Sequence, residues 1–170
     1  EGVVCENLPP PCSILRAGNF TITSDCVMYY EIVVTGKLNV TGVPNADGVL
    51  PKVIGAGHNR LFKVESGGEL LVKYLNLTGG VVVLNEKTII STKSLGASIL
   101  NTGNLRVVNC SLSYNQGKGI IASIGGTFLI KNSVFVNNNV VYNYGSDTEV
   151  FEPNKTMVEG ETVDAPFTTS

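Results

Sequence analysis

The sequence lacks tryptophan, contains one histidine, His58, and has no CxxC motif or other cluster of cysteine and histidine. Because protein zinc sites are built mainly from such clusters, we expect no bound metal. Phosphate-binding loops and Ser/His/Asp sets are also missing. The sequence therefore predicts a protein without a cofactor.

Charge is also scarce: charged residues make up 15% of the 170 residues, and the formal net charge is −2. A chain with so little positive charge is not expected to bind nucleic acid. No run of 18 apolar residues occurs, so we expect no membrane span. Hydrophobic residues nevertheless reach 43%, which suits one domain with a continuous core.

Glycine (19 residues) and asparagine (17 residues) are both frequent. These residues tolerate left-handed backbone conformations, so their abundance indicates many short strands joined by tight turns. Four segments repeat one pattern, in which a glycine and a spacer precede two apolar residues separated by a second spacer. The segments are residues 35–40, 67–72, 102–107 and 125–130. This alternation after a turn is typical of a short strand.

The last two copies of the repeat are 23 residues apart without a gap. In this alignment Asn109 matches Asn132, and Asn115 matches Asn138. The earlier spacings of 32 and 35 residues predict insertions, which we place over residues 44–59 and 85–98. A period of this length, with three short strands, is typical of one coil of a parallel β-helix.

Stacked coils place matching residues above one another. The predicted internal ladders are Leu38, Leu70, Leu105 and Phe128, and Val40, Val72, Val107 and Ile130. The predicted turn ladders pair Asn109 with Asn132 and Asn115 with Asn138. The predicted fold class is all-β, a single right-handed parallel β-helix of about 4–6 coils with capped ends. The alternative, an antiparallel sandwich, would not repeat asparagines at fixed offsets.

Three regions follow from the composition. Residues 1–30, rich in cysteine and proline, are predicted to form an N-terminal cap, and residues 31–145 the coils. Residues 146–170 contain six acidic residues and one lysine, and they lack the repeat. This segment is predicted either to cap its own coils or to act as an arm to a neighbouring subunit. Exposed coil ends and such an arm would make the protein a homo-oligomer.

The stretch from Gly67 to Asn139 resembles the repeats of polymorphic outer-membrane-type adhesins, within the pectin-lyase-like β-helix class. Phe135-Val136-Asn137-Asn138 matches the F-x-x-N motif of that family, and Leu112-Ser113-Tyr114-Asn115 is a degenerate copy. The resemblance covers under half of the chain. It implies a β-helix fold and a surface location more firmly than any activity.

Five N-x-S/T sequons occur, at Asn19, Asn39, Asn76, Asn109 and Asn154, and we predict N-glycosylation at them. The four cysteines, Cys5, Cys12, Cys26 and Cys110, are disulfide candidates, and the sequence does not choose among their pairings. In the other interpretation Cys110 is a small buried hydrophobic residue, which leaves one N-terminal cysteine unpaired. Sequons and cysteines together predict an extracellular or cell-surface location.

An enzymatic β-helix would need clustered acidic groups, but the four aspartates, Asp25, Asp47, Asp147 and Asp164, lie far apart in the chain. We therefore expect no catalytic site. The predicted function is a secreted, glycosylated structural protein that assembles into a filament or surface coat. A monomeric adhesin or carbohydrate-binding module is the alternative. A polysaccharide-active enzyme and an ice-binding protein are less favoured, the latter because no regular threonine face occurs.

Overall fold

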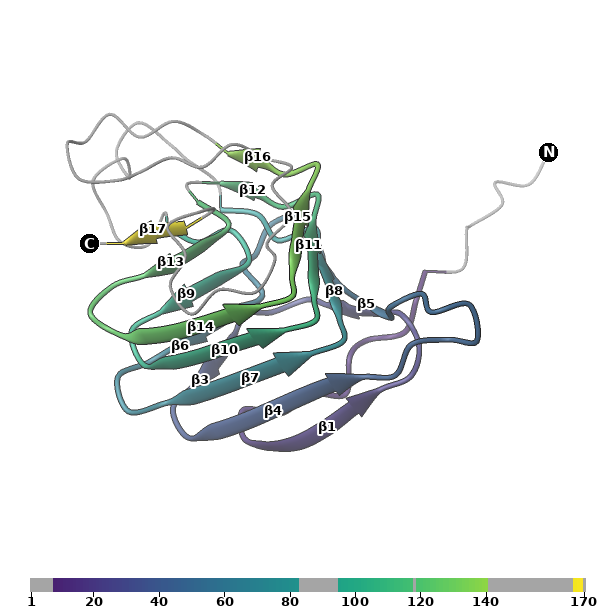
Figure 1. Ribbon diagram of the computed structural model, residues 1–170, viewed down its shortest axis with the longest axis horizontal. Helices are drawn as coiled ribbons and strands as arrows, with labels where there is room; N and C mark the ends of the chain where they lie inside the picture. Colours follow the sequence, from purple (N-terminus) through teal and green to yellow (C-terminus); the bar gives the residue numbers. More distant parts are fainter. Residues whose placement is uncertain (1–7, 83–94, 118, 141–166, 170) are drawn as a thin grey trace.

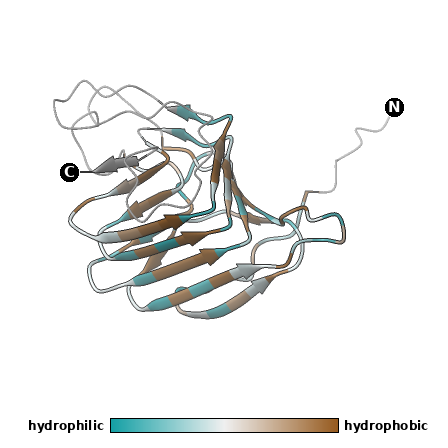
Figure 2. Ribbon diagram, in the orientation of Figure 1, coloured by the Kyte–Doolittle hydropathy of each residue, from teal (hydrophilic) through white to brown (hydrophobic). Residues whose placement is uncertain are grey.

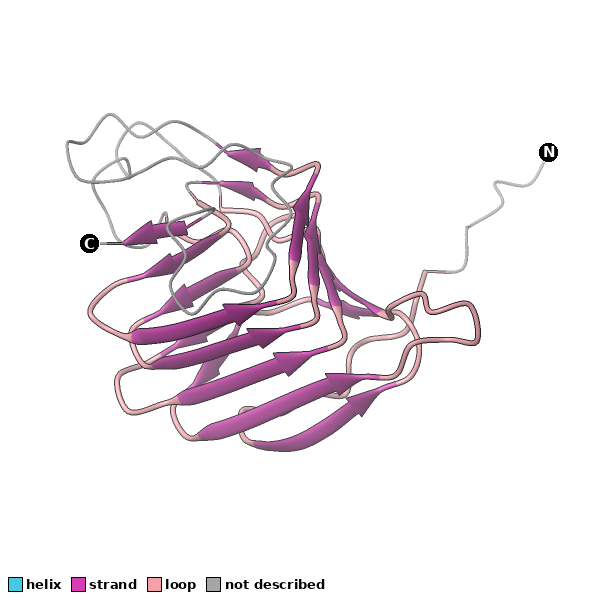
Figure 3. Ribbon diagram, viewed as in Figure 1, coloured by secondary structure: helices cyan, strands magenta, loops and turns pink. Residues whose placement is uncertain are grey.

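The computed structural model describes residues 8–82, 95–117, 119–140 and 167–169. These residues form seventeen strands and contain no helix (Figure 3). The chain is therefore all-β over its described part, as predicted. No helix among these residues is long and apolar enough to cross a membrane.

The strands form three five-stranded sheets and one two-stranded sheet, and all their pairings are parallel. In order, the first sheet contains β1 (Gly18–Ile22), β4 (Lys37–Gly42), β7 (Glu69–Lys73), β10 (Asn104–Val108) and β14 (Thr127–Lys131). The second contains β2 (Cys26–Met28), β5 (Lys52–Gly55), β8 (Asn76–Thr78), β11 (Ser111–Ser113) and β15 (Val134–Val136). The third contains β3 (Ile32–Val34), β6 (Phe62–Val64), β9 (Ile99–Asn101), β13 (Ile121–Ser123) and β17 (Phe167–Thr169). The small sheet pairs β12 (Gln116–Gly117) with β16 (Asn139–Val140).

From β1 to β8 the chain passes through the first, second and third sheets in turn, and each pass adds one strand to each sheet it reaches (Figure 1). Successive strands of a sheet thus come from successive turns of the chain. Parallel stacking of this kind is consistent with the β-solenoid class. Apolar and hydrophilic residues both occur along the strands of the first sheet (Figure 2).

Both predicted internal ladders are confirmed by the register of the first sheet. Leu38 pairs with Leu70, Leu70 with Leu105, and Leu105 with Phe128. The valine ladder continues in the same way to Ile130. All members are buried except Phe128, which is half-buried against the core. The inward positions therefore stack into one continuous apolar core, as period-two alternation requires.

Parallel pairing begins inside the segment predicted to be a cap, because β1 and β2 already pair with β4 and β5. The repeat is hidden in β1 because Gly18 occupies the inward position that Leu38 fills on the next strand. The ring of Phe20 lies 3.4 Å from where a Cβ on Gly18 would be, so it covers the missing side chain.

The insertion predicted over residues 44–59 is shorter than expected. Lys52–Gly55 within it forms β5, which pairs with β2 and β8. Four residues bounded by Pro51 and Ala56 carry too little alternation to be recognised as a strand, although Val53 is fully buried. Most of the second predicted insertion, residues 85–98, lies outside the described residues.

Candidate functional surfaces

One disulfide joins Cys12 to Cys26, and it lies at the first rungs of the stack. The backbone N–H of Cys12 donates to the Val27 carbonyl at 2.9 Å, and the N–H of Val27 donates to the Pro10 carbonyl at 2.9 Å. The disulfide and these bonds fasten residues 10–12 along the edge of β2. The predicted candidate Cys5 lies outside the described residues.

Cys110 has a free thiol and is buried, with 3% exposure. Its thiol donates to the carbonyl oxygens of Val108 at 3.3 Å and Val72 at 3.5 Å. Burial raises the pKa of this thiol from 9.0 to about 12, because desolvation disfavours the thiolate. Cys110 thus fits the interpretation as a small buried residue, and it is not a nucleophile at neutral pH.

The pair Asn115 and Asn138 forms the predicted turn ladder between the second sheet and the small sheet. The Asn115 Nδ2 donates to the Asn138 Oδ1 at 3.1 Å, and its Oδ1 accepts from the Gly80 N–H at 2.9 Å. Both side chains are buried. They satisfy backbone groups that the turn would otherwise leave without partners.

The pair Asn109 and Asn132 lies at equivalent corners between the first and second sheets. The two residues adopt left-handed backbone conformations, with φ of 53° and 50°. The N–H of Asn109 donates to the Lys131 carbonyl at 3.0 Å. These asparagines therefore allow the chain to turn between the two sheets because they tolerate the left-handed backbone conformation.

Two sequons lie side by side on the outer face of the first sheet. Asn19 pairs with Asn39, and the threonines of the two sequons pair with each other. The Asn39 Nδ2 donates to the Asn19 Oδ1 at 2.7 Å. Asn19 is exposed and Asn39 is half-buried.

The other sequons differ in their surroundings. Asn76 is half-buried, and its Oδ1 accepts from the Ser113 hydroxyl at 2.8 Å. The hydroxyl-bearing residue of its sequon, Thr78, is only 9% exposed. Asn109 is half-buried at its corner, and Asn154 lies outside the described residues.

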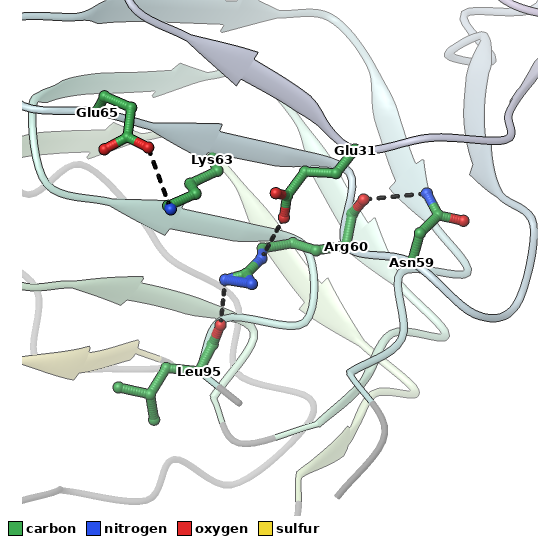
Figure 4. Close-up of polar contacts among 6 residues, drawn as sticks. All are labelled: Glu31, Asn59, Arg60, Lys63, Glu65 and Leu95. Carbon is green, nitrogen blue, oxygen red and sulfur yellow. Dashed lines mark hydrogen bonds and ion pairs between the residues drawn. The ribbon is translucent and has the colours of Figure 1, made fainter. Parts of the chain in front are cut away.

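A partly buried ion pair between Arg60 and Glu31 was not predicted from the sequence. Arg60, which is 9% exposed, donates from Nε to the Glu31 carboxylate at 2.8 Å and from Nη1 to the Leu95 carbonyl at 2.9 Å (Figure 4). The same close-up shows a more exposed pair between Lys63 and Glu65, at 3.1 Å. Because Arg60 bridges neighbouring turns of the chain, its contacts tie the third-sheet corner together.

The acidic residues do not gather into a site among the described residues. No group of three or more His, Cys, Asp or Glu side chains in this part of the chain could hold a metal. The carboxylate of Asp25 accepts from the backbone N–H of Lys52 at 2.9 Å. His58 is exposed and bonds only locally, with Nδ1 3.3 Å from the Ala56 carbonyl oxygen.

An apolar groove of about 590 Å³ lies at the N-terminal end of the stack, between residues 11–16 and 27–32. Three exposed apolar residues line it: Leu15 is 68% exposed, Tyr29 41% and Tyr30 84%. This groove was not predicted from the sequence. The adjacent tyrosines were its only sequence signal, and aromatic residues exposed together often mark a contact surface.

The C-terminal strand β17 pairs in parallel with β13 of the same chain. Over Phe167–Thr169 the acidic segment therefore extends its own third sheet, as in the cap alternative. Residues 146–166 lie outside the described residues. Among the described strands, β14 and β15 pair on one side only at this end of the stack.

Comparison of the chain with protein families, curated proteins and solved structures finds no match. The resemblance to polymorphic outer-membrane-type adhesins thus stays a prediction from short motifs.

Proposed function

We propose that this chain is a secreted, glycosylated structural protein, a right-handed parallel β-helix that assembles end to end into a filament or surface coat. The observation that carries the proposal is the first sheet, whose two terminal strands, β1 and β14, are each five residues long and pair on one side only among the described strands. Parallel edges of this kind recruit further strands.

The unpaired edge of β1 can be assigned to individual residues. The Ile22 carbonyl accepts from the Val43 N–H at 2.9 Å, so Ile22 faces β4. Because backbone groups alternate along a strand, the N–H and C=O groups of Asn19 and Thr21 face away from β4. Both residues are exposed. They therefore offer hydrogen-bonding groups to another strand.

The edge of β14 complements that of β1. The Thr127 N–H donates to the Gly103 carbonyl at 2.8 Å, so the backbone groups of Phe128 and Ile130 face away from β10. If β14 of one subunit lay beside β1 of the next, the parallel ladder would continue across the boundary. Such a heterologous contact does not close and extends into a filament.

Two features support the location and the absence of catalysis. The Cys12–Cys26 disulfide is compatible with an oxidising, extracellular environment. The carboxylate of Asp25 accepts from the Lys52 N–H at 2.9 Å, and no group of three or more His, Cys, Asp or Glu side chains gathers among the described residues. We therefore propose a structural role in place of an enzymatic one.

Replacing Thr21 by proline tests the proposal. Proline removes the N–H that faces the open edge and leaves the ladder to β4 intact, since edge strands tolerate proline at such positions. The matched control is Thr21→Ala, which also destroys the Asn19 sequon but keeps the N–H. We expect sedimentation velocity to show assemblies for the wild type and Thr21→Ala, and a tenfold or greater loss of assembled mass for Thr21→Pro. Equal assembly by all three proteins would rule out the β1 edge.

The groove lined by Leu15, Tyr29 and Tyr30 favours a second candidate, a monomeric adhesin or carbohydrate-binding module. Exposed aromatic rings beside a groove suit stacking against an apolar or saccharide surface. This candidate predicts a monomer in sedimentation and retention on a glycan array that Tyr30→Ala abolishes. The structural subunit predicts assembly that Tyr30→Ala leaves unchanged.

A further inference from the structure

Two complete sequons are stacked residue for residue on the first sheet, an arrangement with consequences for their modification. The register pairs Asn19 with Asn39 and Thr21 with Thr41. Phe20, between Asn19 and Thr21, packs against the core, so the asparagines and threonines share the outer face. Both acceptor nitrogens therefore project from neighbouring strands toward the same solvent region.

The spacing of these strands leaves little room for two glycans. Neighbouring strands lie about 4.8 Å apart, a distance comparable with the width of one pyranose ring. In addition, the Asn39 Nδ2 already donates to the Asn19 Oδ1 at 2.7 Å. Two first sugars at these positions would crowd each other and would disturb this amide bond.

The two positions are not equivalent. Asn19 is exposed and lies on the edge strand, with Asn39 as its one lateral neighbour among the described strands. Asn39 is half-buried and has Asn19 on one side and Leu71 on the other. A glycan on Asn19 Nδ2 leaves its Oδ1 free to accept from Asn39. A glycan on Asn39 replaces one of the two hydrogens on the donating nitrogen.

We infer that the stacked pair Asn19 and Asn39 carries a single N-linked glycan, at Asn19, in the folded protein. This inference rests on the proposed secretion into a compartment with a glycosylation machinery. There a lipid-linked oligosaccharide pyrophosphate is the donor. The bond from the asparagine Nδ2 to the sugar C1 forms, the bond from C1 to the pyrophosphate oxygen breaks, and the amide proton passes to a base while the lipid pyrophosphate leaves.

The stacking acts after transfer. Oligosaccharide transfer takes place on an extended segment, where the two asparagines lie 20 positions apart and neither shields the other. When β1 pairs with β4, a chain modified at both positions must separate the two amides to relieve the crowding. Singly modified chains therefore fold with the Asn19–Asn39 bond intact and predominate in the secreted material.

Peptide mapping of the full chain, secreted from N-glycosylating cells, tests this inference. After reduction, deglycosylation in ¹⁸O-labelled water converts each occupied asparagine to a labelled aspartate. An arginine-specific protease then releases residues 17–60 in one piece, because Arg16 and Arg60 flank both asparagines and no arginine lies between them. We expect one label in this fragment, at Asn19.

Two variants sharpen the test. Thr41→Ala, which removes the Asn39 sequon but keeps its amide, should leave occupancy of Asn19 unchanged. Thr21→Ala should move the single label to Asn39. Two labels in one fragment, a label only at Asn39 in the wild type, or an unlabelled fragment from a protein that is labelled elsewhere would each overturn the inference alone. Absence of label from all five sequons would overturn the proposed glycosylation together with it.

Discussion

At the scale of single residues, the corners of the stack reuse one backbone conformation with different side chains. Tyr74 adopts a φ of 52°, close to the 53° of Asn109 and the 50° of Asn132 at the equivalent corner. Asparagine tolerates this left-handed conformation, whereas most side chains with a Cβ raise its free energy by about 1–2 kcal/mol. Tyr74 therefore adopts a strained backbone conformation, which the asparagines at the equivalent positions, Asn109 and Asn132, tolerate.

Replacing Tyr74 by asparagine should stabilise the protein. The side chain is 40% exposed, so part of its packing is lost, but relief of the left-handed strain should outweigh this loss and raise the free energy of unfolding by up to about 1 kcal/mol. Urea unfolding measures the change. The control Tyr74→Phe keeps the strain and should leave stability nearly unchanged. A Tyr74→Asn protein less stable than Tyr74→Phe would contradict this explanation of the corner.

The buried thiol of Cys110 makes stability depend on pH. Its pKa is raised by burial from 9.0 to about 12, so between these values the unfolded chain loses this proton and the folded chain keeps it. The contribution of Cys110 is complete below pH 9 and falls as pH rises, by up to about 1.4 kcal/mol per pH unit.

The difference in unfolding free energy between wild type and Cys110→Ala isolates this effect from the other groups that titrate in the same range. Measured under non-reducing conditions, the difference should be constant from pH 7 to 8 and should shrink between pH 9 and 10. A difference that stays constant through pH 10 would mean that the thiol is not shielded from water in the folded protein.

At the scale of elements, glycines precede the strands of the first sheet and allow neighbouring coils to approach closely. A Cβ on Gly103 would contact the carbonyl oxygens of Glu65 and Gly68. Gly36, at the same position two rungs earlier, has only the Ala17 Cβ nearby, at 3.9 Å from the position of its own Cβ. Glycine is therefore required at this repeat position in an inner rung, at Gly103, but can be replaced near the N-terminal end of the stack, at Gly36.

Alanine substitutions at these two glycines should separate the two cases. Gly103→Ala forces backbone displacement and should lower the free energy of unfolding by about 2–4 kcal/mol. Gly36→Ala adds a methyl group in open space and should change it by less than about 0.5 kcal/mol. Denaturant unfolding of both variants measures the contrast, and equal losses would show that close approach of the coils is not the reason for Gly103.

These elements also show which strands and contacts can be predicted from the sequence. The Leu38 ladder was predictable because inward apolar residues alternate directly after a glycine turn. The strand β1 was not predictable, because Gly18 has no side chain at the inward position that Leu38 fills on β4. The ring of Phe20, two residues later, covers that space. The ion pair of Arg60 with Glu31 depends on which turns of the chain become neighbours. That alignment follows from insertion lengths, which the sequence alone left open.

At the scale of the whole molecule, the two ends differ. The N-terminal end has residues 10–12 fastened along β2 by the Cys12–Cys26 disulfide, while β1 has an unpaired edge among the described strands. At the other end β17 extends the third sheet, while β14 pairs only with β10. Both terminal strands of the first sheet are five residues long and offer hydrogen-bonding edges, whereas the terminal strands of the third sheet, β3 and β17, are three residues long. The proposed assembly therefore runs through the first sheet.

Electron cryo-microscopy of the purified, glycosylated wild-type chain tests the proposed assembly most directly. The proposal predicts filaments in which strands are spaced about 4.8 Å along the axis and β14 of one subunit lies parallel to β1 of the next. Single subunits at all concentrations, or filaments whose subunits meet through other surfaces, would contradict it.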